Sequence, residues 1–281
     1  IDASAAIGAT LRSFGSVLLA SATLGPAHEF AESVGLPVAE PATVAEGNPL
    51  TDTPLGLTHM VAETPWREGA YRVAYDLRVD TRFRARASHA STTAATVARL
   101  HRAAGACVAV FFPSYRYAEM IEEQIRRSHV TLRVVTQPRL SDLGAQAAWV
   151  EESVVLADVL FLVLGSSFAE SIDALGGRIS HAMVVGPALP EVNAVQAARQ
   201  DLFGGSKNPS AFRRVYQIPG MQKVNQALGR LVRAPGHRAT VLLHCARFAE
   251  ISYASLLAPD YQFGTHLTTD AELDAWLTSA V

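Results

Sequence analysis

The sequence predicts an α/β fold, with a mostly parallel sheet and helices on both of its faces. Short runs such as 106–112 and 159–164 are apolar throughout, which is typical of strands that are buried on both sides. Amphipathic stretches of helical length separate these runs, as in the crossovers that join parallel strands. Of the 281 residues, 49% are hydrophobic, which is enough for a large buried core.

Each element follows from its apolar pattern and from the residues that end it. Pro113 and Gly165 end two strands, and Thr269 with Glu272 forms a capping-box pattern before the last helix. The expected strands are residues 16–20, 71–79, 106–112, 132–135, 159–164, 181–185 and 239–243. The expected helices are residues 89–104, 117–127, 143–156, 192–202, 212–232 with a break at Pro219–Gly220, a stretch near 248–257, and a last one ending near Leu277. Residues 36–69, with five prolines, are expected to be an irregular connection.

The composition excludes several classes of protein. No apolar run reaches the roughly 20 residues that cross a bilayer, and no signal peptide leads the chain. Two cysteines, Cys107 and Cys245, cannot frame a disulfide-rich fold, and no zinc-ligand spacing exists. We therefore expect a cytoplasmic protein without a metal site of its own or a membrane partner.

The positive charge is concentrated in the middle of the chain. Residues 66–140 carry thirteen arginines and six acidic residues, a net charge of +7, whereas the whole chain has −2. Such a segment is a candidate surface for phosphates, and a solvated face is the alternative. Four of these arginines follow a predicted strand at even spacing and could line one side of an extended chain, or lie in a salt-bridged loop: Arg78, Arg82, Arg84 and Arg86.

The sharpest pattern precedes the strand expected at 239–243. Gln226, Gly229, Arg230 and Arg233 have the spacing i, i+3, i+4 and i+7, which on a helix is one face. Two guanidinium groups and an amide on one face can clamp a multiply charged anion such as a triphosphate. Gly229 would let a ligand or a neighbouring backbone come close, and a solvated arginine-bearing helix is the alternative interpretation.

Four motifs in order carry a resemblance to a known family. They are Ser21-Ala-Thr23, Phe111-Phe-Pro-Ser-Tyr115, the loop Gly165-Ser-Ser-Phe-Ala-Glu-Ser-Ile-Asp173, and Gln226-Ala-Leu-Gly-Arg-Leu-Val-Arg233. Together they resemble the C-terminal motor half of the DinG/XPD-like superfamily 2 DNA helicases. The segments Val184–Pro190 and Arg247-Phe248 also fit this pattern, so that the resemblance runs from about residue 16 to 257.

The resemblance implies a RecA-like, P-loop NTPase-type domain that acts as one lobe of an ATP-dependent helicase. Residues 1–24 would end the preceding lobe, and residues 25–281 would form the second. ATP would bind between the lobes, Mg²⁺ mainly on the missing one, and an iron–sulfur cluster only in the missing region. The partner would be single-stranded or forked DNA, followed 5′-to-3′, in DNA repair. The chain starts at Ile1 and lacks a Walker A motif, so we expect a fragment that is inactive alone.

The resemblance also implies a role for individual residues. Ser21 and Thr23 would couple nucleotide state to movement. Glu170 and Asp173 would lie in an acidic loop linking the DNA and nucleotide sites. Gln226, Arg230 and Arg233 would sense the γ-phosphate, with Gly229 beside them and Arg233 as the arginine finger. The DNA backbone would be contacted by Ser114, Tyr115, Arg116, Ser166 and Ser167.

Three residues depart from the family pattern. Ser171 stands where Gly is usual, Ser167 where a larger residue is common, and Cys245 where Asp is usual. They motivate an alternative, a degenerate noncatalytic helicase-like module that binds nucleic acid or protein. The sequence does not distinguish DNA from RNA or an R-loop, and does not give the oligomeric state.

Overall fold

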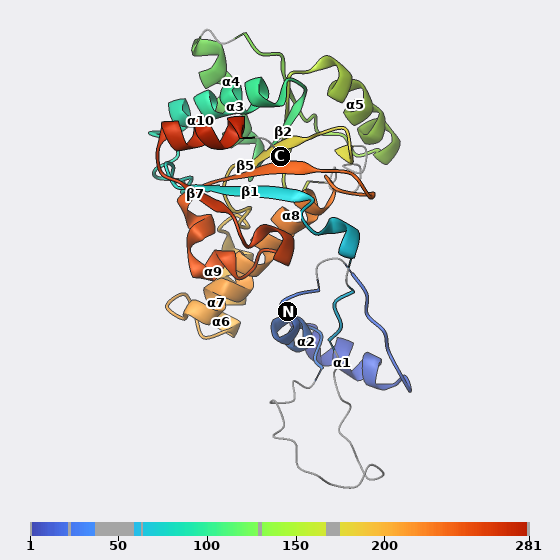
Figure 1. The fold of residues 1–281 in the computed structure, drawn as a ribbon. Helices are drawn as coiled ribbons and strands as arrows, with labels where there is room; N and C mark the ends of the chain where they lie inside the picture. The colour runs from blue at the N-terminus through green and yellow to red at the C-terminus, as the bar shows by residue number, and fades with distance from the viewer. Residues whose placement is uncertain are drawn as a thin grey trace. The chain divides into compact units, whose positions relative to one another are not determined.

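A computed structural model describes residues 2–21, 24–36, 59–62, 64–128, 131–166 and 175–279. It forms two compact units, Ile1–Glu63 and Thr64–Val281 (Figure 1). We describe each unit by itself. The boundary expected after residue 24 would separate two helicase lobes, which is a different division from that into compact units. It stays a prediction.

The first unit contains two short helices, α1 (Ser4–Arg12) and α2 (Ala27–Ser33). They meet at two glycines: a Cβ added to Gly8 would lie 2.3 Å from the carbonyl oxygen of Gly35. The guanidinium of Arg12 donates to that same oxygen at 2.7 Å. The contact therefore needs glycine at position 8, because any side chain would push the backbones apart.

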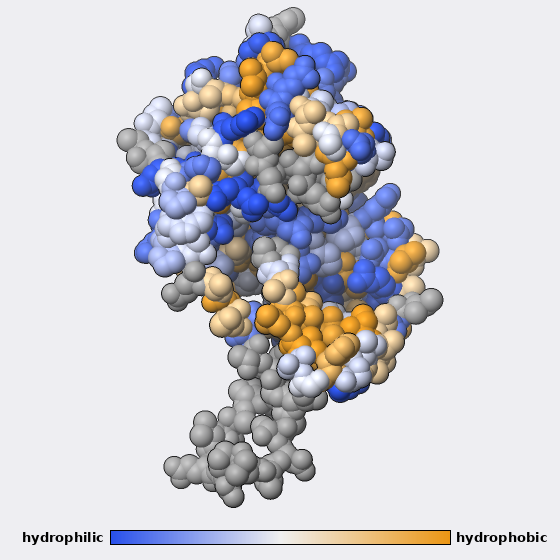
Figure 2. All heavy atoms as spheres, turned by 90° about the vertical axis from the view of Figure 1, so that its right-hand side faces the viewer, coloured by the Kyte–Doolittle hydropathy of each residue, from blue (hydrophilic) through white to orange (hydrophobic). Residues whose placement is uncertain are grey.

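The strand expected at residues 16–20 does not form, so that this prediction was wrong. The segment has no regular secondary structure, and Leu18 is 87% exposed. A strand is stable only when a neighbour pairs with its backbone, and no described strand pairs with this one. The exposed large apolar residues described in this unit are Ile7, Phe14, Val17, Leu18, Leu19, Met60 and Val61. Figure 2 shows one face of the molecule, with a patch of apolar side chains on it.

The second unit is built on a parallel sheet, as predicted. Among the described residues the strand order is β3-β4-β2-β5-β6-β1-β7, and every pair is parallel. The strands are β1 (Tyr71–Asp76), β2 (Val108–Phe112), β3 (Val134–Thr136), β4 (Val159–Val163), β5 (His181–Val184), β6 (Ala239–His244) and β7 (Thr265–Leu267). The sequence missed β7, because this three-residue edge strand has only one buried residue and so no apolar run.

Helices cover both faces of the sheet, with α3, α4 and α10 on one face and α8 and α9 on the other (Figure 1). The helices of this unit are α3 (Ala90–Ala104), α4 (Tyr115–Arg127), α5 (Leu143–Leu156), α6 (Ala194–Leu202), α7 (Pro209–Phe212), α8 (Ile218–Gly229), α9 (Ile251–Ala254) and α10 (Asp270–Thr278). The capping box of Thr269 and Glu272 is present at the start of α10, as predicted. The expected helix at 248–257 is split into a 3-10 turn, Ala246–Ala249, and the short α9.

Successive residues of a strand point to opposite faces of the sheet, so they pack in different hydrophobic cores. Along β2, Ala109 and Phe111 face the core with α8, whereas Val110 and Phe112 face the core with α3 and α4. This alternation follows from the period of two in a strand, and both faces are apolar because both are covered. The continuous apolar runs of the sequence are thereby explained.

The predicted break at Pro219–Gly220 was wrong. A π-helical turn, Arg213–Gln217, leads directly into α8, which begins at Ile218 and has Pro219 in its first turn. The helical backbone thus continues through Pro219 and Gly220. A proline there costs little, since the first turn of a helix has no internal partner for its N–H groups. Gly220 lies against the segment after β5, because a Cβ there would meet the carbonyl of Ala188 at 3.1 Å.

A buried polar network joins the carboxyl ends of β1 and β6. Asp76 and His244 are both fully buried, and His244 Nδ1 lies 2.6 Å from Asp76 Oδ2. Arg78 donates to Asp76 at 2.7 Å and pairs with Asp270 at the start of α10. Burial opposes the ionisation of Asp76, but the hydrogen bonds from Arg78 and His244 outweigh it and hold its pKa far below the usual range.

Of the two interpretations of the four evenly spaced arginines, the structure supports the salt-bridged loop for Arg78 and Arg82 and not an extended chain. Residues 82–88 form turns, so alternate residues do not share a side. The side chain of Arg78 is only 7% exposed, and Arg82 pairs with Asp80 and Glu250. Only Arg84 and Arg86 keep a place on the surface without a carboxylate partner among the described residues.

Among the described residues, no helix is long and apolar enough to cross a membrane.

Candidate nucleic-acid and nucleotide sites

Three of the predicted DNA contacts lie together at the carboxyl edge of the sheet. Ser114 follows β2 and caps α4, since its hydroxyl accepts from the N–H of Tyr117 at 3.4 Å. Tyr115 and Ser166 are joined through Gln137, which follows β3. The structure thus brings the ends of β2, β3 and β4 together, because neighbouring parallel strands end at one edge.

Gln137 holds this cluster in place. Its Nε2 donates to Tyr115 Oη at 2.9 Å and to Ser166 Oγ at 2.8 Å, and its Oε1 accepts from the N–H of Val163 at 2.9 Å. The side chain is 2% exposed, so a lost partner would leave a buried polar group unpaired. No local pattern indicated this residue, because its three partners are 22 to 29 positions away along the chain.

Cationic groups surround the cluster. The guanidinium carbon of Arg139 lies 4.2 Å from the centroid of the Tyr115 ring, and Arg116 is exposed in the first turn of α4. Hydroxyl groups, an N-terminal helix turn and two arginines are the groups that hold phosphates in nucleic-acid complexes. Ser167 lies outside the described residues.

The predicted nucleotide residues lie at the opposite edge of the sheet. α8 ends at Gly229 and leads into β6, so that Arg230 and Arg233 are near the start of that strand. Arg230 is the C-cap residue of α8, and Arg233 lies in the turn beyond it. The prediction that all four residues share one helical face was therefore wrong for Arg233, because the helix ends at Gly229, four residues earlier.

The environment of these residues is partly open. Gln226 and Arg233 are exposed, and Arg230 is half-buried. A Cβ on Gly229 would meet only Tyr261 Oη, at 3.9 Å, so no protein backbone requires glycine there. The missing side chain leaves room at the C-terminal end of α8, which suits the approach of a ligand.

The loop expected to link the two sites starts beside α8, and the two glycines that follow the loop lie against the segment after α8. At the start of the loop, a Cβ on Gly165 would lie 2.6 Å from Lys223 Cε. At its end, a Cβ on Gly176 would lie 2.7 Å from Arg233 Cγ, and the N–H of Gly177 donates to the carbonyl of Leu231 at 3.2 Å. Glu170, Ser171 and Asp173 belong to this loop but lie outside the described residues, as does Thr23. Ser21 is described and exposed.

The glycine pair was the missed signal at this edge. Gly177 has φ of +73°, a conformation that favours glycine, and its position against the ring of His237 leaves no room for a side chain. Gly176 lets the backbone lie directly on the stem of Arg233. Two adjacent glycines after the predicted acidic loop could have indicated such a close approach.

The departure at Cys245 lies in the core. The thiol is fully buried and accepts from Thr81 Oγ1 at 3.1 Å, and that hydroxyl accepts from Arg247 at 3.1 Å. Arg247 is 7% exposed, and its Nε atom is buried without a hydrogen-bond partner. A thiol thus stands beside a buried cation at a place where the family usually has a carboxylate.

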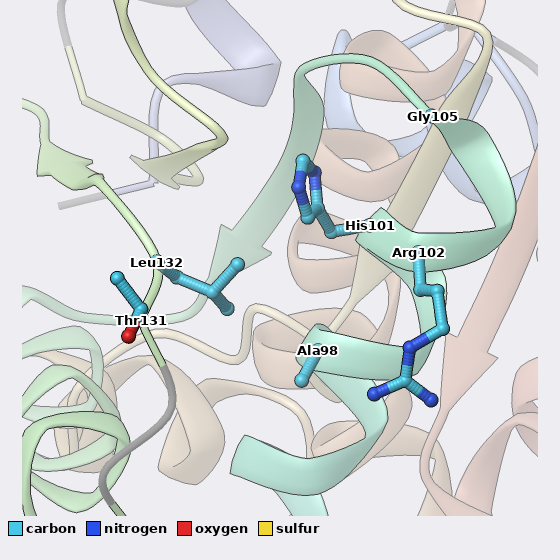
Figure 3. Close-up of a pocket in the computed structure, with 6 residues that line it drawn as sticks. All are labelled: Ala98, His101, Arg102, Gly105, Thr131 and Leu132. Atoms are coloured by element: carbon cyan, nitrogen blue, oxygen red, sulfur yellow. The ribbon is translucent and has the colours of Figure 1, made fainter.

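A separate pocket of about 400 Å³ lies where α3 ends (Figure 3). It is lined by Ala98, His101, Arg102, Gly105, Thr131 and Leu132. None of the predicted site residues lines it. His101 and Arg102 are in the last turn of α3, where a cation interacts favourably with the helix dipole, so they have a structural reason to be there.

Comparisons with known proteins agree with this geometry. The family model described as the helicase C-terminal domain matches residues 97–262. The chain therefore belongs to the helicase C-terminal domain family, and its fold is the RecA-like α/β domain of XPD-type helicases. No curated protein matches the chain.

Three solved structures have this fold. Two, titled XPD helicase and XPD apo, have TM-scores of 0.57 and identities of 20% and 19%, and each covers 70% of this chain. The structure of S. tokodaii Xpd4 has a TM-score of 0.54, 17% identity and 78% coverage. The chain spans only 35%, 40% and 42% of those three chains, respectively.

Proposed function

We propose that this helicase-family domain is the C-terminal motor lobe of an ATP-dependent DNA helicase. ATP would be hydrolysed between it and a preceding lobe that is not in this chain, and hydrolysis would drive movement along single-stranded DNA, 5′-to-3′. The observation that carries the proposal is the packing of Gly176 on Arg233. Gly176 follows the loop that starts at Gly165, beside the nucleic-acid cluster. Its contact therefore connects this loop to the arginine that we expect to reach ATP.

The arginine pair has the chemistry that phosphoryl transfer needs. Charge develops on the transferred phosphoryl group, and a guanidinium presented from a second lobe stabilises it without reorganising water. Arg233 would act as this finger, Arg230 and Gln226 would contact the γ-phosphate, and Gly229 would leave room for it. Glu170 and Asp173 would connect this site to the DNA through the loop.

Mg²⁺ would neutralise the phosphates when the nucleotide is bound. The described residues include no group of three or more His, Cys, Asp or Glu side chains placed to hold a metal ion. We assign Mg²⁺ mainly to the preceding lobe, as the family resemblance implies.

The carboxyl-edge cluster would hold the DNA strand. Ser114, Tyr115, Arg116 and Ser166, with Arg139 added by the structure, offer hydroxyl and guanidinium groups to phosphates. Contacts of this kind position a strand without recognising its sequence, so the lobe would bind with little sequence preference and with strong salt dependence.

ATP turnover by the full-length protein, with and without single-stranded DNA, tests this proposal. We expect stimulation by DNA, and a loss of about 10³- to 10⁵-fold in Arg233→Ala if Arg233 is an arginine finger of the kind known in GTPases. Arg238→Ala is the matched control, because Arg238 is exposed in the same segment and donates to the carbonyl of Gly69. Arg233→Ala turnover equal to that of the control would contradict the proposal.

One observation favours a second candidate, a noncatalytic helicase-like module that binds nucleic acid or protein. Cys245 stands where the family usually has a carboxylate, so this position supplies no negative charge to the buried Arg247. This loss would weaken the coupling between the nucleotide site and movement along the strand. Binding of single-stranded DNA without DNA-stimulated turnover in the wild-type protein would select this candidate.

A further inference from the structure

The turn at residues 82–88 presents an exposed aromatic ring near the predicted DNA contacts. It follows β1 at the carboxyl edge of the sheet, and Phe83 within it is 73% exposed. Single exposed apolar residues are common, so exposure alone indicates nothing. What distinguishes Phe83 is the way the ring is held.

Arg86 joins this ring to α4. Its guanidinium carbon lies 4.7 Å from the centroid of the Phe83 ring and 5.0 Å from that of Tyr117. Tyr117 is buried in the first turn of α4, two residues after Tyr115. The turn is therefore attached, through cation–π contacts, to the helix whose N-terminus carries Ser114, Tyr115 and Arg116.

The surface around the ring is positively charged. Arg84 and Arg116 are exposed, and neither they nor Arg86 form an ion pair with a described carboxylate. Burial lowers the pKa of Arg86, and the positive charge of Arg116 acts in the same direction. In contrast, Asp80 and Glu250 neutralise the neighbouring Arg82.

We propose that Phe83 stacks on a base of the single strand whose phosphates Arg84 and Arg116 contact. This inference rests on the proposed function, which supplies the bound single strand. It adds a contact to a base, whereas the proposed function includes only contacts to phosphates. A flat ring beside unpaired guanidinium groups is the arrangement that binds single strands, since every base has a face for stacking and every phosphate a charge.

The affinity of the full-length protein for a fluorescent single-stranded oligonucleotide tests the inference, in DNA and RNA arms. We expect Phe83→Ala to weaken binding about 5- to 100-fold, which corresponds to the loss of one stacked base. Phe83→Trp should bind within about threefold of the wild type, because it keeps a ring. Phe263→Ala is the matched control, since Phe263 is 88% exposed in a loop of the same unit and should leave binding unchanged.

An oligonucleotide of abasic sites separates stacking from charge. The wild type should lose affinity for it by the same factor that Phe83→Ala loses for the normal strand, and the variant should not distinguish the two strands. If Phe83→Ala binds the normal strand like the wild type while Arg116→Ala weakens binding, the stacking inference is overturned and the proposed function stands. If the wild type binds neither DNA nor RNA single strands, both fail.

Discussion

The two edges of the sheet differ in how they hold their functional residues. At the carboxyl edge, Gln137 and Asp76 are buried within networks of hydrogen bonds that fix their neighbours. At the amino edge, Arg233 extends from a turn and is exposed, with its stem against Gly176. Under the proposed function, the fold itself would complete the surface for the strand, whereas the nucleotide site would present charges that a second lobe completes.

The largest effect should come from the buried carboxylate at the carboxyl edge. Asp76→Asn should lower the free energy of unfolding by about 3–5 kcal/mol, because Arg78 and His244 would lose their buried partner. Urea denaturation measures this change. Asp80→Asn is the control, because the pair of Asp80 with Arg82 is partly exposed and should be worth less than about 1 kcal/mol.

The same carboxylate predicts a direction of pH dependence. The folded-state pKa of Asp76 is lowered, so its contribution is present above the ordinary carboxyl pKa of about 4 and is lost as the pH falls below that value. The stability difference between the wild type and Asp76→Asn should therefore shrink in acid. A difference that grows as the pH falls below 4 would refute the assignment of this network.

At the amino edge, Gly176→Val should affect turnover more than stability. Its Cβ would displace the stem of Arg233, and a misplacement of about 1 Å can reduce catalysis about a hundredfold. DNA-stimulated ATP turnover and thermal unfolding should be measured together. Gly15→Val is the control, since a Cβ at Gly15 meets nothing within 4 Å. Equal turnover in the two variants would show that Arg233 does not depend on this contact.

A smaller effect should follow from Gln137→Leu. The change keeps the size of the side chain but frees Tyr115 and Ser166, so that affinity for single-stranded DNA should fall about tenfold while ATP turnover at saturating DNA is retained. Fluorescence anisotropy measures the affinity. Gln262→Leu is the matched control, because Gln262 is a half-buried glutamine whose side chain donates to the carbonyl of Leu257. This substitution should leave binding unchanged.

The smallest effect concerns a single phosphate contact. Arg116→Ala should reduce the slope of log affinity against log salt by about 0.7, the value for one contact to a single strand. Arg126→Ala should leave the slope as it is, because Arg126 is already paired with Glu122 and Glu123 at the far end of α4. An unchanged slope for Arg116→Ala would remove this residue from the predicted DNA contacts.

The sequence by itself determined the parts of the fold that depend on neighbouring residues. The strands 106–112 and 159–164 and the capping box of Thr269 are present because burial on two faces and capping leave local patterns. The motifs likewise indicated the helicase family, which the family match over residues 97–262 confirms, whereas the roles of Arg230 and Arg233 stay predictions.

Only the tertiary structure decided the contacts between distant segments. Residues 16–20 have the composition of a strand but lack a partner among the described strands, whereas β7 has a partner but lacks the composition. Gln137, the Phe83–Arg86–Tyr117 stack and Gly176 against Arg233 likewise depend on residues far along the chain. Such contacts leave no period or spacing in the sequence, since it is the order and register of the strands that bring them together.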